Sequence, residues 1–296
     1  MVFEFPEWEL FFEQVLFSIQ GTEQEIVEYQ FLASGTYTTC AILKTKNQKY
    51  FLKWHEIGPN NLLAKEAGNL QFLSDKGILV PQVLGYGCVD GKEYLVLSYI
   101  SAQMGNIPYL QLAVQLQELH QNKNIQHGFT TDNYLWGVPQ SNIWYDNGPL
   151  FFAEQRLLKL AGEAMLAEKL DLASFKRIEQ CCNKINELIP NEPASLLHGN
   201  MNTQHLMVQE NNLSYFLNPA CYYGLREAEI AQMLLWGGFD TQFVFVYDAV
   251  DGAIKLEPHF DKRLKVYNLY PLLVTINQGM DNYIAALQNN LKTLGF

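Results

Sequence analysis

Lys53 and Glu66 are two side chains that could do chemistry together. Lys53 lies in the β-type run YFLKW, and Glu66 follows 13 residues later on a helix-type segment. A strand lysine whose ammonium is held by a helix carboxylate can bind the phosphates of a nucleotide. Lys53 alone would be read as a solvated strand residue, so the prediction depends on the pair. We also assign Ser34 and Gly35, in ASGTYTTC, to the turn that covers the phosphates, although a single glycine is a weak signal.

A second stretch, LLHGNMNTQHLMV (residues 196–208), is called the HGN loop below. Two apolar β-type runs enclose His198-Gly199-Asn200 and a short polar turn that ends at His205. Asn200 and His198 are the candidate catalytic residues, with His198 expected chiefly to brace the loop. The loop contains no carboxylate, and an amide such as that of Asn200 can bond a hydroxyl but cannot deprotonate it. Whether the loop still does chemistry therefore depends on the rest of the chain.

The elements around these residues change in type near residue 100. Four β-type runs and one helix-type segment precede it, and mainly helix-type segments follow, together with a hairpin formed by HLMVQ and LSYFL. This order predicts an α+β, bilobal, protein-kinase-like fold. Residues 1–101 would form a small antiparallel sheet lobe that binds nucleotide, after an N-terminal helix. Residues 102–296 would form a larger helical lobe with the HGN loop and an acceptor cleft. The predicted strands cover residues 26–33, 37–45, 49–54 and 93–100, and the predicted helices cover 61–77, 110–121, 150–170, 174–189 and 226–239.

Composition argues against several partners. The chain has 296 residues, 48% of them hydrophobic, and a formal net charge of -11. An acidic surface repels phosphate backbones and anionic membranes, so we expect neither nucleic acid nor a membrane as partner. The N-terminal segment predicts an amphipathic helix rather than a signal peptide, and no apolar run reaches the ~20 residues that span a bilayer. We expect a cytoplasmic protein whose five cysteines are reduced thiols.

Three segments resemble the fructosamine kinase (ketosamine 3-kinase) family, which lies within the aminoglycoside phosphotransferase group. These are LLHGNMNTQHLMV, LNPACYYGLREAEIAQMLLWGGF and KVYNLY, and the family patterns run roughly HGDLWxGN, IDPAxYYGxREADLAxxxLFGGF and YNLY. Other segments, such as YFLKW, VPQVLGYG and FFAEQRL, match in the same order along nearly the whole chain. The resemblance implies ATP as phosphate donor, magnesium as its metal, and a sugar-amine small molecule or a glycated protein as acceptor.

The chain departs from those patterns at the positions that do the chemistry. By the resemblance, Asn200 stands where the family has the Asp that receives the proton of the acceptor hydroxyl. His205 and Asn218 stand where it has the two metal ligands, Asn and Asp. Glu229 replaces the Asp of READLA, and because it is still acidic we expect this change to matter less. Magnesium prefers carboxylate oxygens, so we predict weak or absent magnesium binding and little or no transfer. The protein would then be a catalytically impaired kinase or a pseudokinase, while a nucleotide could still bind without metal.

Two other functions stay open. The first is a working ATP-dependent fructosamine or other small-molecule kinase that tolerates the neutral loop or uses another divalent ion at His205. The second is a binding or scaffold module without catalysis. Trp136, Asn142 and Trp144, in NYLWGVPQSNIW, could contact a sugar-like ligand or could hold their own loop in place.

Overall fold

The computed structural model describes residues 6–32, 38–56, 61–101 and 106–296. The chain divides into two compact units. Unit 1 consists of Met1–Gln103 with the short segment Tyr215–Asn218, and unit 2 consists of Met104–Ser214 with Pro219–Phe296. Asn218, distant in sequence from the sheet, therefore belongs to unit 1.

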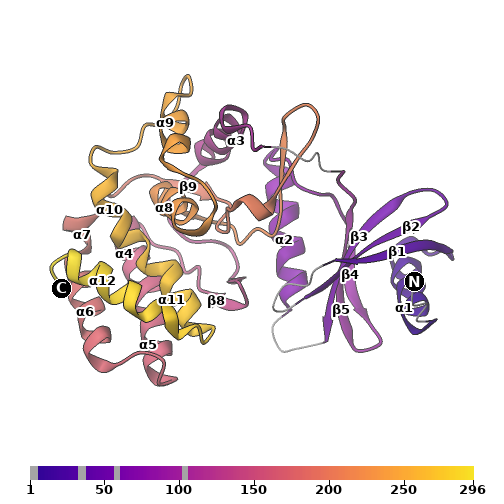
Figure 1. Cartoon of the computed structure of the whole chain (residues 1–296), viewed down its shortest axis with the longest axis horizontal. Coiled ribbons are helices and arrows are strands. Elements are labelled where there is room, and N and C mark those ends of the chain that lie inside the picture. The colour runs from indigo at the N-terminus through magenta and orange to yellow at the C-terminus, as the bar shows by residue number, and fades with distance from the viewer. Residues whose placement is uncertain (1–5, 33–37, 57–60, 102–105) are drawn as a thin grey trace. The chain divides into compact units, whose positions relative to one another are not determined.

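Unit 1 contains a five-stranded antiparallel sheet in the order β1-β2-β3-β5-β4 (Figure 1). Four of these strands were predicted and are confirmed. The fifth, β4, was missed because glycines interrupt its apolar pattern and glycine is a poor strand former. Gly85 has a packing reason, since an added Cβ would lie 2.3 Å from Cγ2 of Ile19. The strands are β1 (Ile26–Leu32), β2 (Thr39–Thr45), β3 (Lys49–Glu56), β4 (Val83–Val89) and β5 (Lys92–Ser98).

Two helices pack on this sheet. The predicted N-terminal amphipathic helix is α1 (Pro6–Gln20), and its Phe12 and Leu16 are fully buried in a core that includes Trp54 of β3. The helix predicted for residues 61–77 is α2 (Leu62–Asp75), which packs against β4 and β5. This second helix carries Glu66 and thereby brings it within reach of β3.

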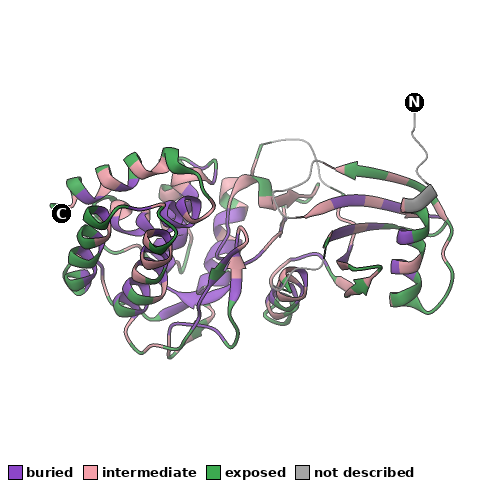
Figure 2. Cartoon of the chain, turned by 90° about the horizontal axis from the view of Figure 1, so that it is seen from below, coloured by how far each residue is buried: buried purple, intermediate pink, exposed green. Residues whose placement is uncertain are grey.

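Unit 2 is mainly helical and is built around α11, whose residues Leu269–Ile276 are all buried. The surrounding helices turn their buried residues inward and their exposed residues outward (Figure 2). Among the described residues no helix is long and apolar enough to cross a bilayer. The α-helices are α3 (Tyr109–Gln121), α4 (Gly148–Phe151), α5 (Lys159–Leu166), α6 (Leu172–Asn183), α7 (Ile185–Leu188), α8 (Arg226–Trp236), α9 (Thr241–Ala249), α10 (Phe260–Tyr267), α11 (Leu269–Asn277) and α12 (Ile284–Thr293).

The helices predicted for residues 150–170 and 174–189 are present but interrupted. A π-helical segment, η1 (Phe152–Leu158), separates α4 from α5, and α7 follows α6 after a break. Hydrophobic periodicity does not distinguish a π-turn from the α-helix that surrounds it, which is why the interruption was not predicted. Two short 3₁₀ segments, η2 (Thr203–His205) and η3 (Asp281–Tyr283), are the remaining helical elements among the described residues of this unit.

Short strands frame the predicted HGN loop. A three-stranded sheet has the order β12-β9-β6. Two separate two-stranded sheets are the hairpins β7-β8 and β10-β11. The hairpin β10-β11 confirms the prediction made from HLMVQ and LSYFL. These strands are β6 (Lys123–Asn124), β7 (Asn133–Leu135), β8 (Val138–Gln140), β9 (Ala194–Leu197), β10 (Leu206–Val208), β11 (Ser214–Phe216) and β12 (Tyr222–Gly224).

Candidate active site

The structure brings Lys53 and Glu66 together as a buried ion pair. β3 places Lys53 in the middle of the sheet, opposite Cys40 of β2 and Leu95 of β5. The Lys53 residue is 6% exposed, and its Nζ lies 2.6 Å from Oε2 of Glu66. The other carboxylate oxygen of Glu66 is buried and has no hydrogen-bond partner among the described residues. A carboxylate that holds a lysine in this way fixes the direction in which the ammonium can donate.

Asn218 is a further partner of Lys53 within unit 1. Nζ of Lys53 donates to Oδ1 of Asn218 at 3.0 Å. The backbone of Asn218 has φ 54°, in the left-handed region that asparagine tolerates better than most residues. The amide oxygen carries no formal charge, so the positive charge of Lys53 meets one carboxylate here rather than two. The other predicted nucleotide contacts, Ser34 and Gly35, lie outside the described residues.

The HGN loop contains a glycine that the packing requires. Gly199 follows the buried strand β9 with φ 77°, and an added Cβ would lie 2.1 Å from the carbonyl oxygen of Ala220. The N–H of Ala220 in turn donates to the carbonyl of His198 at 2.9 Å. No side chain beyond hydrogen fits at position 199, so the loop passes directly against the segment that precedes β12.

Asn200, the candidate base position, is 5% exposed and is held from two sides. Its backbone N–H donates to Nδ1 of His198 at 3.3 Å. Its side-chain Oδ1 accepts a hydrogen bond from the indole Nε1 of Trp136 at 2.8 Å. The structure therefore brings the two candidate catalytic residues together, with the ring of His198 bonded to the loop backbone. Trp136, which the sequence marked for a ligand contact or for holding its own loop, bonds Asn200 instead, a contact that the sequence did not predict.

His205 is tied into the same loop through one ring nitrogen. Its Nδ1 lies 2.8 Å from the carbonyl of Asn200 and 2.8 Å from Nδ2 of Asn202. Asn202 also caps the 3₁₀ turn by accepting from the N–H of Gln204 at 2.9 Å. One ring nitrogen of His205 is therefore used within the loop, whichever tautomer is present.

The residues at the predicted metal positions do not fit a magnesium ion well. Magnesium is held by hard oxygen ligands, usually carboxylates, whereas Asn218 offers an amide oxygen that already accepts from a cation, and His205 offers a nitrogen. In the described part of the chain, no three His, Cys, Asp or Glu side chains are grouped so that they could hold a metal ion.

Glu229 braces the HGN loop with its carboxylate, the group that it shares with the Asp of the family pattern. Oε1 accepts from the N–H of Gly199 at 2.6 Å, and Oε2 accepts from the N–H of His198 at 3.3 Å. Nε2 of His120 lies 2.9 Å from Oε2, and its Nδ1 lies 2.7 Å from the hydroxyl of Tyr247. A neutral His120 that donates to Glu229 and accepts from Tyr247 satisfies both contacts.

The electrostatics of this buried pair agree with that arrangement. Burial lowers the pKa of His120, so its ring stays neutral. Burial alone would raise the pKa of Glu229, but the hydrogen bond from His120 and the N–H of Gly199 hold it below its ordinary value. A buried carboxylate with donors from two backbone amides and one imidazole therefore keeps its charge. The sequence signal that could have identified His120 is a histidine at the end of an otherwise amphipathic helix, LQELH.

Asn142 belongs to the support of its own loop rather than to an exposed ligand surface. The residue is 1% exposed, its Oδ1 accepts from Nη2 of Arg156 at 2.7 Å, and its Nδ2 donates to the carbonyl of Thr131 at 3.0 Å. Arg156, fully buried on η1, lies over the ring of Tyr222 at 4.1 Å from the centroid. Of the two roles left open for Asn142, the structure favours the one in which it holds the loop.

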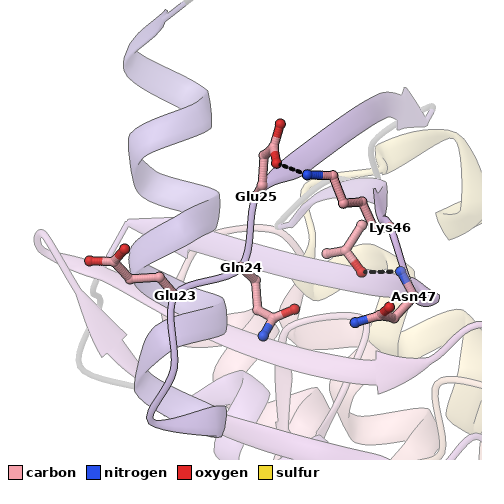
Figure 3. Close-up of a pocket in the computed structure, with 6 residues that line it drawn as sticks. Glu23, Gln24, Glu25, Lys46 and Asn47 are labelled. Atoms are coloured by element: carbon pink, nitrogen blue, oxygen red, sulfur yellow. Dashed lines mark hydrogen bonds and ion pairs between the residues drawn. The ribbon is translucent and has the colours of Figure 1, made fainter.

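A shallow hollow elsewhere in unit 1 does not coincide with any predicted site. It measures about 270 Å³ and lies between the end of α1 and the turn after β2 (Figure 3). Glu25 and Lys46 form an exposed ion pair across it, and the N–H of Asn47 donates to Oγ1 of Thr45 at 3.3 Å. These side chains are paired with one another and face water, so the hollow is not a candidate site.

Comparison with solved structures defines the class of protein. An aminoglycoside phosphotransferase crystallised with ADP and hygromycin B has a TM-score of 0.65 at 13% identity, over 95% of this chain and 96% of that one. A protein from Haemophilus somnus, provisionally named fructosamine-3-kinase, has a TM-score of 0.83 at 24% identity, over 95% and 96% of the two chains. Both likenesses concern the fold. The chain has the bilobal fold of the aminoglycoside phosphotransferases and protein kinases, as predicted.

Sequence comparison then gives the family. The profile of the fructosamine kinase family matches residues 8–294. A probable ketoamine kinase from Vibrio parahaemolyticus is 30% identical over 273 residues, which cover 90% of this chain and 92% of the relative. The chain belongs to the fructosamine kinase family, and the resemblance seen in the sequence is confirmed.

Proposed function

We propose that this protein binds a nucleotide of the ATP type at Lys53 and a sugar-amine ligand beside the HGN loop, with slow phosphoryl transfer between them. The contact between Lys53 and Asn218 carries this proposal. In it, an ammonium meets a neutral amide at a position where the family resemblance implies a metal-binding Asp. Without that carboxylate, the triphosphate meets one negative side chain fewer, so the positive charge of Lys53 can attract the phosphates directly.

The base position supports the slow transfer. Asn200 cannot take a proton from an acceptor hydroxyl. General-base assistance contributes about 10²–10⁴-fold to a rate, which corresponds to ~3–5 kcal/mol of barrier. Phosphoryl transfer depends mostly on positioning and electrostatics, so a residual rate is expected. In this proposal, residues 1–101 bind the nucleotide and residues 102–296 bind the acceptor.

A second candidate function is that of a working ATP-dependent ketoamine kinase. Membership of the fructosamine kinase family over residues 8–294 favours it, as does the name of the Vibrio relative. The intact ion pair of Lys53 with Glu66 and the brace of Glu229 also agree with an active site. The acceptor would be a small sugar-amine molecule or a glycated protein. The two candidates differ in rate, so kinetics decide between them.

The test is phosphoryl transfer from ATP to fructoselysine, with magnesium and then with manganese. The variants are Asn200→Asp, Asn218→Asp and the double change. We expect the double variant to turn over at least 100-fold faster than the original protein in magnesium, because it regains both a base and a carboxylate ligand. A rate in the original protein equal to that of the double variant would mean that the neutral loop is competent, and the protein would then be an active ketoamine kinase.

Nucleotide binding is tested separately by thermal shift with ATP in EDTA. A ligand at a hundred times its Kd stabilises the folded state by ~2.7 kcal/mol. We expect this shift in the original protein and its loss in Lys53→Met. Lys49→Met, on the exposed start of the same strand, is the matched control and should keep the shift. The absence of any shift in the original protein would refute the nucleotide site.

A further inference from the structure

Trp136 adopts a backbone conformation that is unusual for its type. It is the first residue of the two-residue connection between β7 and β8, with φ 52°, and Gly137 follows with φ 79°. Positive φ at both central residues is typical of a type I′ hairpin turn, where Asn-Gly or Gly-Gly is favoured. A tryptophan in the left-handed region costs free energy, and strain of this kind concentrates at functional positions. The hairpin itself does not require an indole here.

Contacts of Trp136 hold the strained residue in place. Its carbonyl accepts from Nε2 of Gln278 at 2.5 Å, and its ring lies 5.5 Å from that of Trp236, centroid to centroid. The ring of Trp236 in turn lies 5.2 Å from that of Tyr283. All three aromatic side chains are half-buried. The indole therefore rests on an aromatic surface that a ligand could reach if the indole moved.

The polar end of the indole bonds the atom that an acceptor would need. Its Nε1–H donates to Oδ1 of Asn200 at 2.8 Å. By the proposed function, on which this inference rests, Asn200 is the residue that an acceptor hydroxyl contacts. That hydroxyl is also a hydrogen-bond donor toward Oδ1, and the indole N–H already occupies one of the two acceptor positions of this oxygen.

We propose that Trp136 is a specificity-determining gate of the acceptor position: its indole takes the place of the acceptor hydroxyl on Asn200, and only a ligand that displaces it binds. Displacement exposes the rings of Trp236 and Tyr283, which suit the flat C–H face of a sugar ring. A small polyol without such a face gains too little contact to displace the indole. The strands on both sides are anchored independently, because Asn133 donates to the carbonyl of Cys221 at 2.9 Å and Gln140 donates to that of Ala220 at 3.0 Å. The side chain can therefore move while the hairpin stays in place.

Calorimetric titration with fructoselysine tests the gate in four proteins. These are the original chain, Trp136→Gly, Trp136→Phe and the control Phe245→Leu, which changes an exposed aromatic residue on α9. Trp136→Gly removes the competing donor and places the residue that the turn favours, so we expect its Kd to be at least 10-fold lower. Trp136→Phe keeps a ring but loses the N–H, and its Kd should fall between those two. Phe245→Leu should match the original protein.

These titrations distinguish a failure of the gate from a failure of the proposed function. If Trp136→Gly binds fructoselysine no more tightly than the original protein, or binds none, while its ATP-induced thermal shift shows that it is folded, the gate is refuted. Weaker binding in Trp136→Gly would show that the indole is a wall that the ligand stacks on, which also refutes the gate. Loss of the ATP shift in every protein, with fructoselysine binding still tightened by Trp136→Gly, would refute the nucleotide proposal and leave the gate standing.

Discussion

Replacing Glu229 by glutamine removes the charge that holds the HGN loop and keeps the size of the side chain. In the structure the carboxylate accepts from the N–H groups of Gly199 and His198 and from Nε2 of His120. A glutamine offers one oxygen and one NH₂ group. Whichever way the amide is turned, at least one backbone N–H of the loop then faces another donor.

The size of the effect follows from this geometry. Hydrogen bonds to charged groups contribute ~1.5–3 kcal/mol each, and a buried donor left without an acceptor costs ~1–3 kcal/mol. These are two descriptions of overlapping losses, so we expect Glu229→Gln to lower the free energy of unfolding by about 2–4 kcal/mol. At roughly 2–4 °C for each kcal/mol in domains of this size, the Tm should fall by roughly 4–16 °C.

The assay is thermal unfolding at neutral pH, with Glu179→Gln as the matched control. Glu179 is exposed on α6, and its change should leave the Tm within the error of the measurement. Repeating the series at lower pH gives a second check. The pKa of Glu229 is held below its ordinary value, so the stability it contributes is complete above pH ~4.5 and is lost as the pH falls further. If the Tm of Glu229→Gln equals that of the control variant, the carboxylate does not brace the loop.

Further predictions concern a glycine and two buried histidines. Gly199→Ala should destabilise the protein by more than about 2 kcal/mol in denaturant unfolding, because the new Cβ meets the carbonyl of Ala220 and the backbone is left-handed. Gly162→Ala, in an open position on α5, should instead stabilise the protein by up to about 1 kcal/mol, and equal effects at the two positions would contradict the packing argument. Burial lowers the pKa of both His120 and His127, so the unfolded chain binds protons that the folded chain does not. Stability should therefore fall below pH ~6.5, by up to about 1.4 kcal/mol per pH unit for each histidine; a stability flat between pH 7.5 and 5.5 would refute this.

The local pattern of residue types along the chain was sufficient to predict most of the fold. Four strands of the unit 1 sheet, α1 and α2 follow from hydrophobic periodicity and turn residues, because these depend on neighbours a few positions apart. The same pattern could not show β4, whose glycine at position 85 is explained only by the approach of Ile19 from α1. It could not show the π-helical turn of η1 either, since that turn accompanies the packing of the buried Arg156.

The candidate site, too, has a part that the sequence could predict and a part that depends on packing. The ion pair of Lys53 with Glu66 could be predicted because the strand and the helix that carry them follow closely in the chain. The positions of Asn200, His205 and Asn218 could be singled out through the family resemblance. The contacts of Glu229 could not be predicted, since a sequence does not show which backbone amides a buried carboxylate will meet.

The sequence by itself determined the family, the two-part α+β architecture and the chemical character of the loop, because the order of residue types along the chain carries all three. Only the tertiary structure decided which atoms those residues bond. Lys53 donates to the amide oxygen of Asn218 across 165 positions, and Trp136 donates to that of Asn200 across 64. Contacts at such separations depend on how whole elements pack within each unit. A hydrogen bond forms only within a narrow range of donor–acceptor distances, and the order of residues along the chain does not specify distances that finely.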